Sequence, residues 1–150
     1  MNRPRYFTIH ELADPAIIAE RGENGTWVLL DHNILRAADW LRERFGPISI
    51  NGLYKGVLFT ESGLRRANTT TGAKFSQHKS GKALDLKFHN IEEGDVYGFI
   101  MANQEQAYRM GIRRVENIAF TGRVGGGGWL HIDCKETGAA MVNRIQVVKP

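Results

Sequence analysis

Helix-type and strand-type apolar patterns alternate at irregular intervals along this chain of 150 residues. Apolar side chains recur at helical spacing from Asp31, which is suited to cap a helix, to about Arg44, and again over residues 95–110. Short apolar runs typical of strands occur at residues 48–50, 57–59, 83–88, 112–115, 129–134 and 145–148. Such a mixture predicts an α+β fold in which helices cover an antiparallel sheet.

Turn-forming residues mark the ends of several of these elements. Pro15 predicts a helix start, Gly46 ends the first long helix, and Gly111 suits a left-handed cap after the second. Asn-Gly at residues 51–52 lies between two short apolar runs and predicts a β-hairpin. The four glycines at residues 125–128 predict a flexible turn.

Composition indicates a single soluble domain over residues 1–150. Hydrophobic residues make up 42% of the chain and charged residues 24%, and no apolar run is long enough to span a bilayer. The single cysteine, Cys134, excludes an internal disulfide and a multi-thiolate zinc site. The first residues lack the apolar core of a secretory signal, so we expect a cytoplasmic pool and no stable membrane association.

The charge balance is mildly basic. Lys and Arg number 20 against 16 Asp and Glu, giving a net charge of +4. This excess favours anionic partners such as nucleic acid or a bacterial wall polymer, although ordinary solubility explains it equally well. Because the sequence has no basic helix, zinc finger or aromatic-basic motif, we expect no nucleic-acid binding.

A long irregular segment precedes the first group of chemistry-bearing residues. Residues 61–77 are rich in Ser, Gly, Thr, Asn and Arg, and a loop this long in a compact domain is often functional. His78 follows it, and Asp85 lies between two leucines on the predicted strand 83–88. Strand alternation sends Asp85 to the face opposite those leucines, where a buried carboxylate must be paired, hydrogen-bonded or bound to metal.

A second group lies on the predicted strand 129–134. Alternation places His131 and Asp133 on one face of this strand and the apolar residues between them on the other. Two imidazoles and one carboxylate are sufficient for a catalytic zinc site, which takes three protein ligands and leaves a position for water. The alternative from these residues alone is a structural His/Asp network.

These motifs resemble those of a known peptidase family. Residues 76–85, with the pattern Ser-x-His-x-x-Gly-x-Ala-x-Asp, resemble the first zinc motif of the D-Ala-D-Ala carboxypeptidase and L-alanyl-D-glutamate endopeptidase family. Residues 129–133 resemble its second motif. Residues 62–65 resemble its Ser-Gly-Tyr-Arg segment, Asn68 matches an asparagine after that arginine, and residues 7–12 resemble the start of related phage and bacterial wall-peptidase domains.

The resemblance implies a hedgehog-like DD-peptidase fold whose antiparallel sheet carries a zinc site. By matching positions, the zinc ligands would be His78, Asp85 and His131. Arg65 would bind a substrate carboxylate or polarise the scissile carbonyl, work that suits a planar and permanently charged guanidinium. Ser76 would hydrogen-bond the substrate peptide.

The chain also departs from the family pattern. Several relatives carry an acidic general base three positions before the last histidine, where this chain has Gly128. Glu116 and Asp133 are then the candidate bases. In relatives the residue equivalent to Asp133 orients a metal ligand instead. For Glu116 the alternative role is a salt bridge to a neighbouring arginine. Leu64 replaces the family's tyrosine.

The resemblance implies a monomeric zinc metallopeptidase that hydrolyses a bond in peptidoglycan stem or cross-link peptides. Either a carboxypeptidase-like or an endopeptidase-like activity fits, and the expected location is a cytoplasmic or phage-associated pool that acts on the cell wall. The alternative is a catalytically inactive, zinc-stabilised wall-binding or phage structural module, which the missing acid at Gly128 favours.

Overall fold

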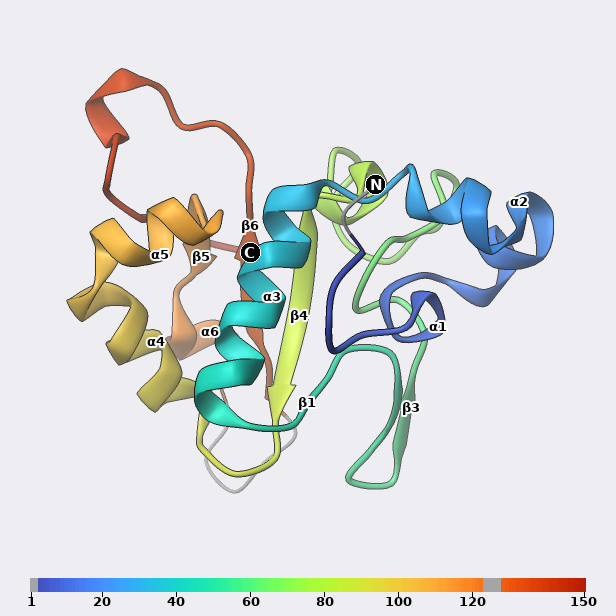
Figure 1. Ribbon diagram of the computed structural model, residues 1–150, viewed down its shortest axis with the longest axis horizontal. Coiled ribbons are helices and arrows are strands. Elements are labelled where there is room, and N and C mark those ends of the chain that lie inside the picture. Colours follow the sequence, from blue (N-terminus) through green and yellow to red (C-terminus); the bar gives the residue numbers. More distant parts are fainter. Residues whose placement is uncertain (1–2, 123–127) are drawn as a thin grey trace.

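A five-stranded sheet forms the centre of the protein, as a computed structural model that describes residues 3–122 and 128–150 shows (Figure 1). The strands follow the order β1-β4-β6-β5-β7. Their bounds are β1 Ile48–Ser49, β4 Ala83–Phe88, β6 Leu130–Asp133, β5 Arg114–Glu116 and β7 Gln146–Val148. Neighbouring strands are antiparallel except β5 and β7, which are parallel. The predicted α+β class is confirmed, but the sheet is mixed rather than wholly antiparallel.

Helices flank the sheet along most of the described chain. In chain order the α-helices are α1 Ile9–Leu12, α2 Pro15–Trp27, α3 His32–Phe45, α4 Glu93–Ala102, α5 Gln104–Met110 and α6 Ile118–Thr121. Two 3-10 turns, η1 Gln77–Ser80 and η2 Ala139–Met141, complete the set in the described ranges. As predicted, α2 starts at Pro15, the Asp31 side chain caps α3 and Gly46 ends α3; the Asp14 side chain also caps α2. None of these helices is both long and apolar enough to cross a membrane.

The hydrophobic core fills the space between α3 and one face of the sheet. Leu84 and Leu86 of β4 and Ile132 of β6 are fully buried in one apolar cluster with the inner face of α3 (Figure 1). Because side chains alternate along a strand, this packing directs Asp85 and His131 to the other face. The core thus leaves a polar face of the sheet for the candidate site.

The turn of the hairpin lies at residues 55–56, not at the Asn-Gly pair of residues 51–52 as predicted. Strand β2 (Gly52–Tyr54) pairs with β3 (Val57–Phe59), and Lys55 and Gly56 form the turn with φ of 48° and 79°. Two consecutive positive φ values match the twist that a two-residue hairpin needs. Asn51 instead accepts a hydrogen bond from the Ser62 amide, and the run at 48–50 supplies β1, which pairs with β4.

The predicted helix over residues 95–110 is two helices. Asn103 has φ −124° and ψ 42°, outside the helical region, and its side chain donates to the Phe99 carbonyl, so the chain breaks between α4 and α5. The left-handed cap at Gly111 is confirmed, with φ of 114°. The flexible turn predicted for residues 125–128 lies, except for Gly128, outside the described residues.

Candidate metal centre

Three elements bring the predicted ligands together. His78 lies on η1, which the Ser76 side chain caps, while Asp85 on β4 and His131 on β6 are direct cross-strand partners. Gly81 joins η1 to β4 with φ of 67°, and a β-carbon there would lie 1.9 Å from the Leu29 carbonyl oxygen. Only glycine can therefore make this close turn, which explains why a glycine stands between the histidine and the strand.

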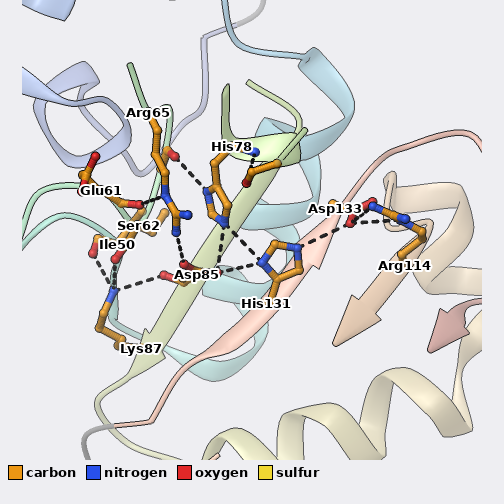
Figure 2. Close-up of polar contacts among 12 residues, drawn as sticks. Ile50, Glu61, Ser62, Arg65, His78, Asp85, Lys87, Arg114, His131 and Asp133 are labelled. Carbon is orange, nitrogen blue, oxygen red and sulfur yellow. Dashed lines mark hydrogen bonds and ion pairs between the residues drawn. The ribbon is translucent and has the colours of Figure 1, made fainter. Parts of the chain in front are cut away.

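The ligand atoms converge on one point. Asp85 Oδ1 lies 2.8 Å from His131 Nδ1 and 3.2 Å from His78 Nε2, and the two histidine nitrogens are 3.3 Å apart (Figure 2). All three residues are buried. Ligand atoms about 2.0–2.1 Å from a tetrahedral zinc ion are roughly 3.3 Å apart, so these three atoms are spaced like metal ligands.

The tautomer of each histidine follows from the hydrogen bond made by the ring nitrogen that faces away from the cluster. His78 Nδ1 is 2.9 Å from the Gly63 carbonyl oxygen and must donate to it, which leaves Nε2 of the neutral ring as an acceptor. His131 Nε2 is 3.4 Å from Asp133 Oδ2 and donates there, which leaves Nδ1 as an acceptor. Two imidazole lone pairs and a carboxylate oxygen then face one another, an arrangement that a cation satisfies.

The electrostatics of the metal-free cluster agree with this view. Burial lowers the pKa of His131, but hydrogen bonds to Asp133 and Asp85 outweigh it and raise that pKa to about 10. Burial raises the pKa of Asp85, but the neighbouring histidines outweigh it and hold that pKa well below its usual range. Without a metal, the cluster retains a proton where a cation would otherwise bind, so metal binding is expected to release protons.

Asp133, which hydrogen-bonds His131, forms a bidentate ion pair with Arg114. Arg114 on β5 donates to both carboxylate oxygens of Asp133, from Nε at 2.8 and 3.1 Å and from Nη2 at 2.7 Å (Figure 2). Asp133 is fully buried, and although burial alone raises its pKa, the contacts with His131 and Arg114 lower it. Asp133 is therefore held ionised as an orienting group, which makes it a poor proton acceptor.

Replacing this orienting carboxylate should weaken metal binding without removing a ligand. Asp133→Asn keeps the shape but loses the charge that favours the required His131 tautomer, so we expect a 10- to 100-fold loss of zinc affinity, measured by competition with a chelator. Asp95→Asn, which changes an exposed aspartate on α4, is the control and should have no effect. Equal affinities for the two variants would contradict the orienting role.

Glu116 lies with the cluster in a cavity of about 410 Å³. It ends β5, is partly buried, and makes no ion pair with any described residue, so the alternative of a salt bridge to a neighbouring arginine is not observed. Burial raises its pKa above the usual range, with Asp85 and Asp133 adding to the rise and His131 and His78 opposing it. Of the two candidate bases, Glu116 has the more suitable environment.

Arg65 lies beside the cluster and is 9% exposed. Its Nη2 donates to Asp85 Oδ2 at 2.9 Å, and its Nε donates to the Glu61 carbonyl. A β-carbon on Gly72 would lie 2.7 Å from Nη1, so the loop backbone packs against the guanidinium. Ser76 lines the same cavity, and its Oγ accepts from the His78 amide at 3.4 Å.

Lys87 is a buried residue behind the cluster that the sequence analysis missed. Its side chain is fully buried, and Nζ donates to Ile50 O, Ser62 Oγ and Asp85 O at 2.7, 2.8 and 3.2 Å (Figure 2). Burial lowers its pKa to about 8. Because Lys87 follows Asp85 by two positions on β4, strand alternation was an available signal that both share one face.

Lys87→Met should destabilise the protein. The change removes the ammonium that donates to three oxygens inside the protein, and we expect the free energy of unfolding to fall by about 1–3 kcal/mol, measured by urea denaturation. Lys74→Met, which makes the same change at an exposed position, should stay within about 0.5 kcal/mol of the parent. A parent-like Lys87→Met would show that these hydrogen bonds contribute little.

The structure gathers every predicted site residue around the same cavity. The set comprises Arg65, Ser76, His78, Asp85, Glu116, His131 and Asp133. Comparisons with protein-family models, with curated proteins and with solved structures find no match to this chain. What is shown is a buried His-Asp-His group that can hold a metal ion, in a cavity that also contains Glu116 and Arg65.

Proposed function

We propose that this protein is a zinc metallopeptidase that hydrolyses a peptide bond in peptidoglycan stem or cross-link peptides. The convergence of His78 Nε2, Asp85 Oδ1 and His131 Nδ1 carries the proposal. Two nitrogens and one oxygen are a typical donor set for catalytic zinc, although manganese or nickel also accepts such ligands. The position of the cluster on the sheet face opposite α3 supports a hedgehog-like peptidase fold.

The chain's own residues supply the proton transfers that hydrolysis needs. Bound zinc would contribute a Lewis acid and a water of lowered pKa. Glu116 accepts a proton as the water hydroxyl bonds to the carbonyl carbon, and it returns that proton to the amine nitrogen when the C–N bond breaks. Its raised pKa suits both steps, because a general base works best with a pKa near the working pH.

Arg65 and Ser76 would bind the peptide. Arg65 uses Nε and Nη2 for Glu61 and Asp85, and Nη1 makes no hydrogen bond with the described residues. Arg65 lines the cavity, and this remaining nitrogen would bind a substrate carbonyl or carboxylate oxygen. Ser76, at the start of η1, offers a hydroxyl to the peptide backbone.

Glu116 also favours a hydrolase over an inactive wall-binding module. Gly128 cannot transfer protons, and it is buried. Glu116 lies in the same cavity as the cluster and makes no ion pair with any described residue, so it can supply the acidic group that is missing at position 128. This favours the hydrolase. The net charge of +4 would help the protein remain on an anionic wall, which it would reach from a cytoplasmic or phage-associated pool.

Mass spectrometry of purified peptidoglycan after incubation with the zinc-loaded protein tests this function. A peptidase produces fragments with a new amino terminus or a lost terminal residue, and the fragment masses identify the bond. Intact peptides from several wall chemistries, with one zinc per chain present, would reject hydrolysis and leave the wall-binding module, which sedimentation with cell walls would then detect.

A further inference from the structure

A second cavity adjoins the one that contains the metal-binding cluster. It measures about 310 Å³ and lies beside β3, where Leu58, Phe59 and Trp129 form part of its lining. The two cavities share four lining residues, which are Arg65, Thr71, Asp85 and Trp129. The two cavities therefore adjoin at Asp85 of the cluster, and we treat them below as two arms of one groove.

The strand order shows how the first arm runs. Its lining passes Val148 on β7, Glu116 on β5, His131 on β6 and Asp85 on β4. The second arm adds Leu58 on β3, a strand of the separate β2–β3 hairpin. Strands are about 4.8 Å apart, so the part from β7 to β4 covers ~14 Å, the length of about four extended residues. The groove crosses the sheet, and the cluster lies between its arms rather than at one end.

Both arms mix polar and apolar residues. The arm toward β7 includes the charged groups Arg114, Glu116 and Lys149 together with Phe75 and Val148. The arm toward β3 presents Leu58, whose exposed fraction is 69%, next to the partly buried Phe59 and Trp129. Exposed leucine beside aromatic rings suits an apolar group, so the second arm favours an aliphatic side chain.

Arg65 lines both cavities and so lies where the two arms meet. Two of its nitrogens are bound to Glu61 and Asp85, which holds the guanidinium against the groove wall. The cavity continues beyond it to Leu58. A peptide that contacts Arg65 can therefore extend past it, whereas an enzyme that removes one terminal residue needs a groove that ends there.

We infer, on the basis of the proposed peptidase activity, that the cavity beside β3 is a substrate subsite that binds an aliphatic side chain of an extended peptide. The peptide continues on both sides of the reacting bond, and the protein is an endopeptidase. The cavity shares Asp85 and Arg65 with the cavity around the cluster, which favours the substrate itself as the occupant over a partner protein or a second copy of the chain.

The hairpin offers a matched pair of variants. Leu53 is the cross-strand partner of Leu58, with an exposed fraction of 70%, but it does not line the cavity. The substrate is a pool of soluble muropeptides, both single and cross-linked, followed by mass spectrometry with zinc content measured in the same samples. We expect Leu58→Asn to lower kcat/KM about tenfold, and Leu53→Asn to match the parent.

The possible results are distinguishable from one another. Internal cleavage that leaves at least two residues on each side, with a selective defect in Leu58→Asn, supports the subsite. Release of a single terminal residue, or equal kcat/KM for the two variants, overturns the subsite and leaves the peptidase standing. A loss that is the same in both variants and accompanies self-association identifies an interface. No cleavage by the zinc-loaded parent rejects the peptidase, and the subsite with it.

Discussion

His131→Ala is expected to lose tight zinc binding and all metal-dependent hydrolysis. His131 Nδ1 lies 2.8 Å from Asp85 Oδ1 and supplies one of the three converging ligand atoms. Removing it leaves a two-ligand site, so the affinity should fall by more than the roughly 100-fold limit typical of orienting residues. Calorimetric titration of the metal-free protein with zinc measures the change.

His32→Ala is the control for this prediction. His32 is exposed at the start of α3 and is not one of the predicted metal ligands, so its removal should leave zinc affinity unchanged. Thermal unfolding of both variants in the presence of a chelator compares their folds without the metal. A folded His131→Ala that still binds one zinc ion with the parent affinity would show that His131 is not a ligand.

Glu116→Gln is expected to retain zinc and to lose about 10²- to 10⁴-fold in kcat, the usual contribution of a general base. The amide preserves the size of the side chain but cannot accept the proton. Burial raises the pKa of Glu116, so in the parent kcat/KM should fall as the pH drops through this raised value, at a higher pH than an ordinary glutamate would give. The pH profile of kcat/KM measures this acid limb.

Glu92→Gln, at an exposed position before α4, is the matched control and should keep the parent's rate and pH profile. Asp133→Asn separates the two candidate bases, because it should weaken zinc binding while its rate at saturating zinc stays much closer to the parent's. Turnover by zinc-loaded Glu116→Gln at the parent rate would remove Glu116 from the mechanism.

The elements that local pattern specifies are well predicted from this sequence. Alternation over residues 83–88 and 129–134 correctly placed Asp85 and His131 on the face away from the core, since each strand buries its apolar residues against the helices. Elements that depend on a single side-chain contact were less predictable. The break at Asn103 and the turn at residues 55–56 follow from local hydrogen bonding and positive φ values, which apolar periodicity does not reveal.

The candidate site shows the same division. The histidines and Asp85 belong to recognisable motifs, and their convergence was predicted. The contact of Arg114 with Asp133 joins two strands 19 residues apart, and the contact of Lys87 with Ile50 joins residues 37 apart. Such long-range pairs depend on strand order and on the path of loops, so the sequence shows the residues but not their partners.

Metal-dependent cleavage of peptidoglycan tests the central claim most directly. The protein is stripped with a chelator, dialysed and titrated with zinc while the peptides released from purified peptidoglycan are quantified. Cleavage should disappear on stripping and return in proportion to added zinc up to one ion per chain. Cleavage that survives removal of the metal, or full zinc binding that restores none, would contradict a zinc peptidase built on His78, Asp85 and His131.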